Sequence, residues 1–213
     1  MILLSDNDIL IKLSQCDLVD EFLTVYGCTL SECRVLNEAR YSLFLNNPDK
    51  CIARRVGSAA AYDRLHQLIM SCATLGAADE DLDFLEELSQ IDNIDPGEQA
   101  LLLHASNMNR SGESYYLATG DRKALLGIHN SASDRAKEVL IGRVDCTESL
   151  ILKFIGVYGF DIINSKISSA AQSTSSDRFD DVLRMAFGSQ RDKAHATECL
   201  QSYLAPVSHF ICP

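Results

Sequence analysis

The period of the hydrophobic positions changes within the first thirteen residues. Residues Ile2 to Leu4 are all apolar, which is typical of a short strand buried on both faces of a parallel sheet. From Asp8 onward the apolar positions follow helical spacing: Ile9, Leu10, Leu13 and Cys16. Asp6 is therefore predicted where a central strand ends and a helix begins, the edge of an open α/β sheet at which ligands bind. A plain helix-capping role explains Asp6 or Asp8 equally well.

Short apolar runs continue to alternate with helical periodicity along the chain. Further strands are predicted at 28–30, 115–119 and 141–146. The main predicted helices are 31–44, 58–72, 82–88, 95–105, 134–140, 147–158, 162–170, 178–187 and 193–204, with a polar loop at 107–114. This order predicts an α/β fold, a three-layer α/β/α sandwich with a central, mainly parallel sheet and a C-terminal helical extension.

The chain divides into two predicted parts. Residues 1–160 form the α/β domain, in which residues 46–90 are an enlarged helical insertion, and residues 161–213 form the extension. The extension contains apolar residues that are too numerous to stay solvated: Leu183, Met185, Phe187, Leu200 and Leu204. We expect it to pack on the core or to form a homodimer face.

Three further acids stand at places comparable to Asp6. Glu38 borders the apolar face of the predicted helix 31–44, and Asp121 follows Gly120 just past the strand 115–119. Glu98 is the third helical residue in Asp95-Pro-Gly-Glu98, which has the pattern of a capping box. Each acid has a structural alternative, as a cap or as a solvated carboxylate.

Charge and composition limit the classes of function. The 213 residues carry a net charge of −11 with a pI near 4.8, which argues against broad, charge-driven binding of duplex DNA. The eight cysteines show no C-x-x-C pair and are expected to be reduced thiols. The start lacks a basic segment of a signal peptide, and the longest apolar stretch, 150–160, is interrupted by Lys153. We expect a cytoplasmic protein without a membrane partner.

Four segments together resemble the PIN-domain family of metal-dependent nucleases. They are Leu3-Leu-Ser-Asp-Asn-Asp-Ile-Leu-Ile11, Val35-Leu-Asn-Glu-Ala39, Asp95-Pro-Gly-Glu-Gln-Ala100 and Leu117-Ala-Thr-Gly-Asp121. The resemblance covers residues 1–159 and implies a Mg²⁺- or Mn²⁺-dependent nuclease acting on single-stranded nucleic acid, RNA favoured over DNA. It implies that the metal ligands and catalytic acids are Asp6, Glu38, Glu98 and Asp121.

Neighbouring residues complete the predicted site. Asp8 and Thr119 are expected to support the acids, and Arg122 and Lys123 to meet a substrate phosphate. Crowded carboxylates repel one another unless a cation offsets them. Mg²⁺ or Mn²⁺ takes such oxygen ligands, and two ions about 3.5–4 Å apart can activate water and stabilise a leaving oxygen.

The chain departs from the smaller toxin members of that family. Its section 46–90 and its tail are enlarged, and its third acid is a glutamate. A toxin role with an antitoxin-like protein inhibitor therefore stays open, as does a catalytically degenerate binding or scaffold module that acts through protein partners. No P-loop, no G-x-G-x-x-G and no G-x-S-x-G motif points to another phosphate-handling enzyme or to a serine hydrolase.

Overall fold

The structure is a computed structural model that describes residues 2–78 and 81–213. Its centre is one five-stranded, all-parallel sheet with the strand order β3-β2-β1-β4-β5. The strands are β1 (Ile2–Ser5), β2 (Cys33–Leu36), β3 (Ala73–Leu75), β4 (Tyr115–Thr119) and β5 (Val144–Cys146). The predicted α/β class and parallel sheet are confirmed. The expected burial of the first strand on both faces concerns the side chains of Ile2 and Leu3, which lie outside the described part.

Strand β1 lies in the middle of the sheet, between β2 and β4. Leu3 pairs with Cys33 of β2, and Ser5 pairs with Ala118 of β4. All strands run the same way, so their carboxyl ends meet at one edge. The carboxyl ends of β1, β2 and β4 therefore lie at the same edge, although these strands are far apart in the sequence.

Helices connect the strands and cover both faces of the sheet. They are α1 (Asn7–Cys16), α2 (Val19–Tyr26), α3 (Ala39–Ser42), α4 (Pro48–Cys51), the π-helix η1 (Ile52–Val56), α5 (Ala59–Ser71), α6 (Leu82–Ser89), α7 (Pro96–Ser111), α8 (Arg122–Asn130), α9 (Asp134–Leu140), α10 (Thr147–Tyr158), α11 (Phe160–Ser173), α12 (Asp181–Ala186), α13 (Lys193–Leu204) and the 3₁₀-helix η2 (Ala205–Phe210).

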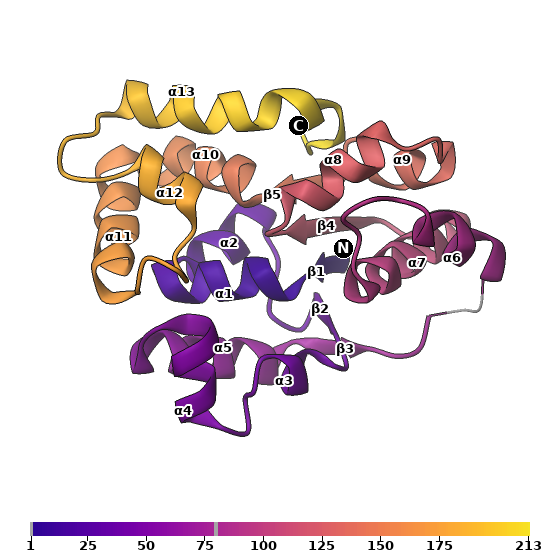
Figure 1. Ribbon diagram of the computed structural model, residues 1–213, viewed down its shortest axis with the longest axis horizontal. Helices are drawn as coiled ribbons and strands as arrows, with labels where there is room; N and C mark the ends of the chain where they lie inside the picture. The colour runs from indigo at the N-terminus through magenta and orange to yellow at the C-terminus, as the bar shows by residue number, and fades with distance from the viewer. Residues whose placement is uncertain (1, 79–80) are drawn as a thin grey trace.

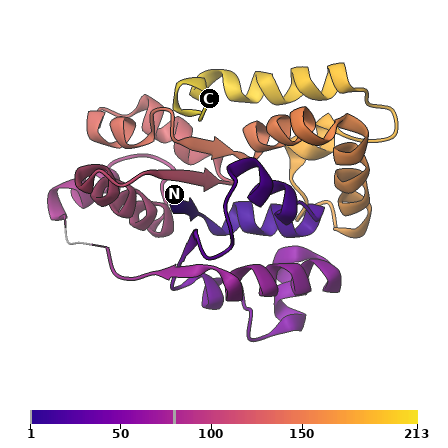
Figure 2. The same cartoon turned by 180° about the vertical axis from the view of Figure 1, so that it is seen from behind.

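Two hydrophobic clusters fill the space between the layers. Helices α1, α2, α5, α10 and α11 contribute to the cluster on one face, and α6, α7, α8 and α9 to the cluster on the other (Figure 1; Figure 2 gives the reverse view). The molecule is thus a three-layer α/β/α sandwich, as the alternating pattern predicts.

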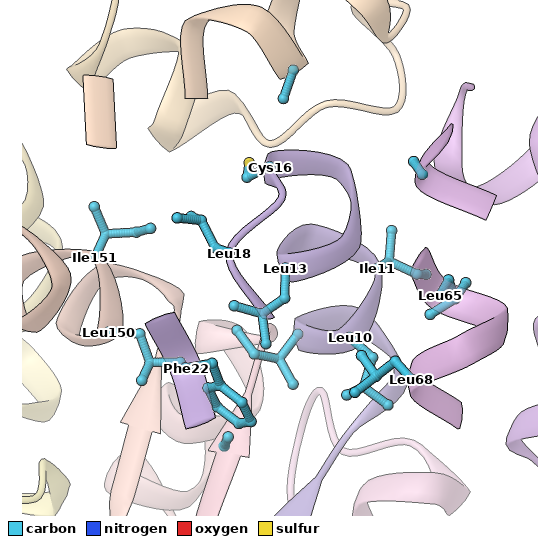
Figure 3. Packing of buried hydrophobic residues seen from close by; sticks show 14 of the residues in the cluster. Leu10, Ile11, Leu13, Cys16, Leu18, Phe22, Leu65, Leu68, Leu150 and Ile151 are labelled. Atoms are coloured by element: carbon cyan, nitrogen blue, oxygen red, sulfur yellow. The ribbon is translucent and has the colours of Figure 1, made fainter. Parts of the chain in front are cut away.

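Helix α1 lies at the centre of the larger cluster. In Figure 3, Leu10 and Ile11 of α1 face Leu65 and Leu68 of α5, while Phe22 of α2 lies on another side of α1. All of these side chains are buried. Burying a leucine or phenylalanine side chain contributes about 1.5–3 kcal/mol, so this packing fixes the direction of α1 and the position of its N-terminus.

The predicted helix 31–44 is wrong. Residues 33–36 instead form β2, whose side chains alternate between buried and half-buried, and the helix α3 occupies only Ala39–Ser42. Apolar residues at 35, 36, 39 and 43 also fit a helical period, but pairing with both β1 and β3 satisfies the backbone of residues 33–36. The strand expected at 28–30 is absent, because residues 30–32 form a turn.

Further differences from prediction concern β3, α7 and β5. The edge strand β3 follows α5 directly and lies inside the section 46–90 that was expected to be helical. Helix α7 continues to Ser111 through residues assigned to the polar loop 107–114, and β5 begins at Val144 instead of 141. Short edge strands and polar residues on the outer side of a helix leave weak signals in a hydrophobic pattern.

The C-terminal segment packs on the rest of the chain. Leu183 and Leu200 are buried in the α1 cluster, and Leu204 belongs to the other cluster. At the end of the chain the backbone N–H of Cys212 donates to the carbonyl of Val144 in β5 at 2.8 Å. Met185, expected to pack, is 44% exposed. None of the described helices has both the length and the apolar character to cross a lipid bilayer.

Candidate functional site

A cavity of about 290 Å³ opens at the carboxyl-end edge of the sheet, beside the ends of β1 and β2. Five of the residues that line it are acidic: Asp6, Asp8, Asp95, Glu98 and Asp121. They come from the β1–α1 junction, the start of α7 and the β4–α8 junction. The parallel sheet therefore gathers carboxylates from three separate segments around one hollow.

Asp6 is the most buried of these acids, with 8% of its surface exposed. It caps α1: its Oδ1 accepts the backbone N–H of Ile9 at 2.7 Å. It also accepts the backbone N–H of Gly120, at 2.9 Å through Oδ2, and the hydroxyl of Thr119. Burial raises the pKa of the Asp6 carboxyl to about 6, although these hydrogen bonds favour the ionised form.

Thr119 connects Asp6 with Asp121. The Thr119 hydroxyl donates to Asp6, and the same oxygen accepts the backbone N–H of Asp121 at 3.0 Å. Asp121 itself caps α8, since its Oδ1 accepts the backbone N–H of Lys123 at 2.7 Å. Asp121 thus has the structural role of a cap, in addition to its place in the cavity wall.

Gly120 allows the β4–α8 junction to approach the start of α1. A Cβ atom at Gly120 would lie 2.6 Å from the Cβ of Asp8 and 2.7 Å from the backbone nitrogen of Ile9. Such distances are too short for any side chain. The glycine therefore permits the approach that brings the junction carrying Asp121 beside Asp6.

Lys12 ties the same junction to the C-terminal segment. Its ammonium group donates to the carbonyl of Gly120 at 2.6 Å and lies 2.8 Å from the carboxylate of Asp180. Burial disfavours the charge, but Asp180 and Asp8 outweigh this effect and raise the pKa of Lys12. The positive charge beside the site is thus already engaged with carboxylates and a carbonyl.

Glu98 stands in the first turn of α7 as predicted. The capping box is complete, with the Asp95 side chain accepting the backbone N–H of Glu98, and Glu98 Oε2 accepting that of Asp95, both at 2.8 Å. Burial, together with the charges of Asp95, Asp121 and Asp6, raises the pKa of Glu98 to about 8. The hydrogen bond from the backbone N–H of Asp95 uses Oε2 of Glu98, so no capping bond occupies Oε1.

The other predicted site residues divide into two groups. Asp8 lines the cavity and pairs with Lys12 at 3.7 Å, whereas Glu38 follows β2, is exposed, and is not among the residues that line the cavity. Arg122 donates to the carbonyl of Tyr203 at 3.0 Å and lies over its ring, while Lys123 is exposed. The structure therefore brings together three of the four predicted catalytic acids and turns Arg122 toward the C-terminal segment.

Several polar residues of the cavity wall, Ser5 among them, were not predicted as site residues. Asn7, Ser42 and Arg55 line the cavity, and Asp95 does so as well as capping α7. Asn7 donates to the Ser42 hydroxyl at 3.0 Å, and Arg55 donates to the Ser42 carbonyl at 2.9 Å. The adjacent basic residues Arg54 and Arg55 were the only hint of such a residue in the sequence. The fold shows that Arg55, and not Arg54, lines the acidic cavity.

The acidic cavity has the donor groups that a divalent cation binds. Carboxylate oxygens are the ligands that Mg²⁺ and Mn²⁺ prefer. Burial is the main cause of the raised pKa values of Asp6 and Glu98, and the charges of neighbouring acids add to it, so a bound cation would favour the ionised forms. The donor chemistry and the charge of the five lining carboxylates fit such a cation. In the conformation seen, however, no three Asp, Glu, His or Cys side chains of residues 2–78 and 81–213 are grouped so that they could hold a metal ion.

A larger hollow of about 530 Å³ lies elsewhere, between α11 and the segment that follows α12. Serine, asparagine and glutamine residues predominate among its polar lining residues, and no titratable side chain lines it. It lacks the groups for acid–base chemistry, so the smaller acidic cavity is the candidate site.

The chain matches no protein-family model, no curated protein and no solved structure. The resemblance to the PIN-domain family therefore stays a prediction.

Proposed function

We propose that this protein is a Mg²⁺- or Mn²⁺-dependent nuclease that hydrolyses phosphodiester bonds, with single-stranded RNA as its favoured substrate. The observation that carries the proposal is the convergence of Asp6, Glu98 and Asp121 on one cavity at the carboxyl-end edge of a parallel sheet. Carboxylates from separate elements at such an edge are suited to binding a hard cation. The metal ligands in this proposal are Asp6, Glu98 and Asp121, with Glu38 outside the cavity as the fourth predicted ligand.

Asp6 and Thr119 have defined parts in the proposed reaction. Asp6 is held in one orientation by Ile9, Thr119 and Gly120, which presents a fixed, negatively charged carboxylate. Thr119 holds the backbone of Asp121 beside Asp6, because its hydroxyl donates to Asp6 and accepts the N–H of Asp121. A divalent ion bound at these acids would supply water activation and stabilisation of the leaving oxygen.

The test is cleavage of a fluorescent single-stranded RNA with Mn²⁺ and with EDTA. Asp121→Asn should abolish Mn²⁺-dependent cleavage while the melting temperature stays the same or rises, because asparagine is an equally good cap and one repelling charge is removed. The matched control is Asp134→Asn, at an exposed first-turn residue of α9 that does not line the cavity. Equal Mn²⁺-dependent cleavage by both variants would refute the assignment of Asp121 as a catalytic acid.

A second candidate function is a binding or scaffold module that acts through protein partners. One observation favours it: Asp6, Glu98 and Asp121 all act as helix-terminus hydrogen-bond acceptors, so each has a structural reason to be present. In that case the wild type neither binds Mn²⁺ nor cuts any single-stranded substrate. Glu98→Gln, which keeps the capping hydrogen bond, would change neither Mn²⁺ binding nor cleavage.

A further inference from the structure

One basic side chain lines the acidic cavity. Among the lining residues, which all belong to the described part, Arg55 is the only lysine, arginine or histidine. None of the ion pairs found within residues 2–78 and 81–213 involves it. Its guanidinium charge therefore lies beside carboxylates without being neutralised by one.

The guanidinium of Arg55 is held in place by a neutral acceptor and by a ring. One terminal nitrogen donates to the carbonyl of Ser42 at 2.9 Å, and the group lies 5.5 Å from the centre of the Phe44 ring. The Nε atom is buried and has no hydrogen-bond partner. A guanidinium has five N–H donors, so besides the buried Nε and the donor to Ser42, three N–H donors on the terminal nitrogens are left for a ligand.

The backbone that presents Arg55 is also unusual. Arg55 belongs to the π-helix η1, a rare element that occurs frequently at functional sites. The side chain of Gln15 in α1 donates to the carbonyl of Arg55 at 3.3 Å, which connects η1 to the helix that Asp6 caps. The position of Arg55 relative to the acids is thus fixed by packing and by hydrogen bonds.

The charge of the surrounding segment points to an anionic ligand. Residues 40–64 contain five basic and two acidic side chains, a net charge of +3, in a chain whose total is −11. Tyr41, next to the cavity residue Ser42, is 71% exposed. A locally positive segment attracts a polyanion, and an exposed aromatic ring beside the cavity offers a face on which a base can stack.

We propose that Arg55 binds a phosphodiester group of a single-stranded nucleic acid at the acidic cavity. The planar guanidinium of arginine can donate two parallel hydrogen bonds to two phosphate oxygens, whereas the ammonium group of lysine interacts as a point charge. This inference rests on the proposed function, because it takes the same substrate for the same cavity. It assigns the phosphate contact to Arg55, in addition to the positions Arg122 and Lys123 suggested by the sequence.

The test measures binding, so that its outcome does not depend on cleavage. The parent protein is Asp121→Asn, and Arg55→Gln, Arg55→Lys or Arg54→Gln is added to it. Each protein is titrated into a fluorescein-labelled ten-nucleotide single-stranded RNA in the presence of Mn²⁺. Arg54 is the matched control, since it is the exposed neighbour in η1 and does not line the cavity. Melting temperatures verify that each variant is folded, and Arg55→Lys replaces Arg55→Gln if the latter unfolds.

Arg55→Gln should weaken binding about 10-fold and reduce the slope of log K against log salt by about 0.7, the value for one phosphate contact on a single strand. Arg55→Lys should retain the slope but lose affinity, and Arg54→Gln should stay within about twofold of its parent. Equal effects of Arg54→Gln and Arg55→Gln, or no binding by the parent, would overturn the inference. A nuclease that cleaves without this Arg55 effect leaves the proposed function standing, whereas an Arg55 effect without cleavage by the wild type refutes only the hydrolysis.

Discussion

The hydroxyl of Thr119 donates a hydrogen bond to the carboxylate of Asp6, although the two residues are 113 positions apart in the sequence. Their strands, β4 and β1, are parallel neighbours, so both residues emerge at the same edge of the sheet. The Thr119 oxygen also accepts the backbone N–H of Asp121. One threonine therefore sets the relative position of two predicted catalytic acids.

Thr119→Val tests this connection. Valine has nearly the same shape but no hydroxyl, so Asp6 loses a donor and the N–H of Asp121 loses an acceptor. Leaving such buried groups unpaired costs about 1–3 kcal/mol each, and we expect the free energy of unfolding in urea to fall by roughly that amount. Thr119→Ser keeps the hydroxyl and should stay within about 1 kcal/mol of the wild type. A valine variant as stable as the serine variant would show that the hydroxyl does not connect the acids.

The raised pKa values of Glu98 and Asp6 predict that stability falls as pH rises. The folded chain holds a proton on Glu98 up to about pH 8, whereas the ordinary value is 4.5, and on Asp6 up to about pH 6 instead of 3.8. The contribution of each group to the free energy of unfolding is complete below its ordinary pKa and is lost as pH rises through its raised pKa. In EDTA, the free energy of unfolding should therefore decrease between pH 5 and pH 8.

Glu98→Gln identifies the main group behind this pH dependence. The charges that act on Glu98 come from Asp95 on its own helix and from Asp121 and Asp6 on the neighbouring junctions. The variant cannot ionise, so it should lose part of the decrease and be more stable than the wild type at pH 8. The control is Glu86→Gln, at an exposed position of α6. Unfolding curves at pH 5 and pH 8 that shift equally in the wild type and in Glu98→Gln would contradict the assignment.

Gly120→Ala tests the close approach between the β4–α8 junction and α1. The added Cβ would meet backbone atoms of Asp8 and Ile9 at 2.7 Å, so the junction has to move. Overpacking of this kind costs about 1–3 kcal/mol, and the junction bearing Asp121 should shift relative to Asp6. Gly156→Ala, in α10 where nothing lies within 4 Å, should instead stabilise the protein by about 0.5–1 kcal/mol. Two variants of equal stability would contradict the geometry of the junction.

The hydrophobic pattern predicts the central elements of this fold well. The strong periodicity of α1 and the apolar run before it correctly place Asp6 at the end of a strand, and the Tyr115–Thr119 run does the same for Asp121. The Asp95-Pro96 start of α7 is likewise local, because capping depends on adjacent residues. These positions are predictable since each is fixed by its own neighbours.

The segment 31–44 shows where the sequence is insufficient. Its apolar residues fit both a helix and a strand, and only pairing with β1 and β3 selects the strand. As a result Glu38, placed on a helix flank by the sequence, instead follows β2 and is exposed. The contribution of Arg55 to the cavity is equally non-local, because it depends on Ser42 and Gln15 in other helices. The composition of a site that several segments share is decided by tertiary packing.

The most direct test of the central claim is the position of Mn²⁺ in a crystal soaked with MnCl₂. The anomalous signal of manganese distinguishes the ion from a water molecule. We predict a peak in the acidic cavity, about 2–2.5 Å from carboxylate oxygens of Asp6, Glu98 and Asp121, with Glu98 Oε1 or Oε2 as a ligand. A crystal of Asp121→Asn should show a weaker peak or none at this place. The absence of manganese from this cavity in the wild type, at a concentration that labels other surface carboxylates, would contradict the proposal of a metal-dependent nuclease.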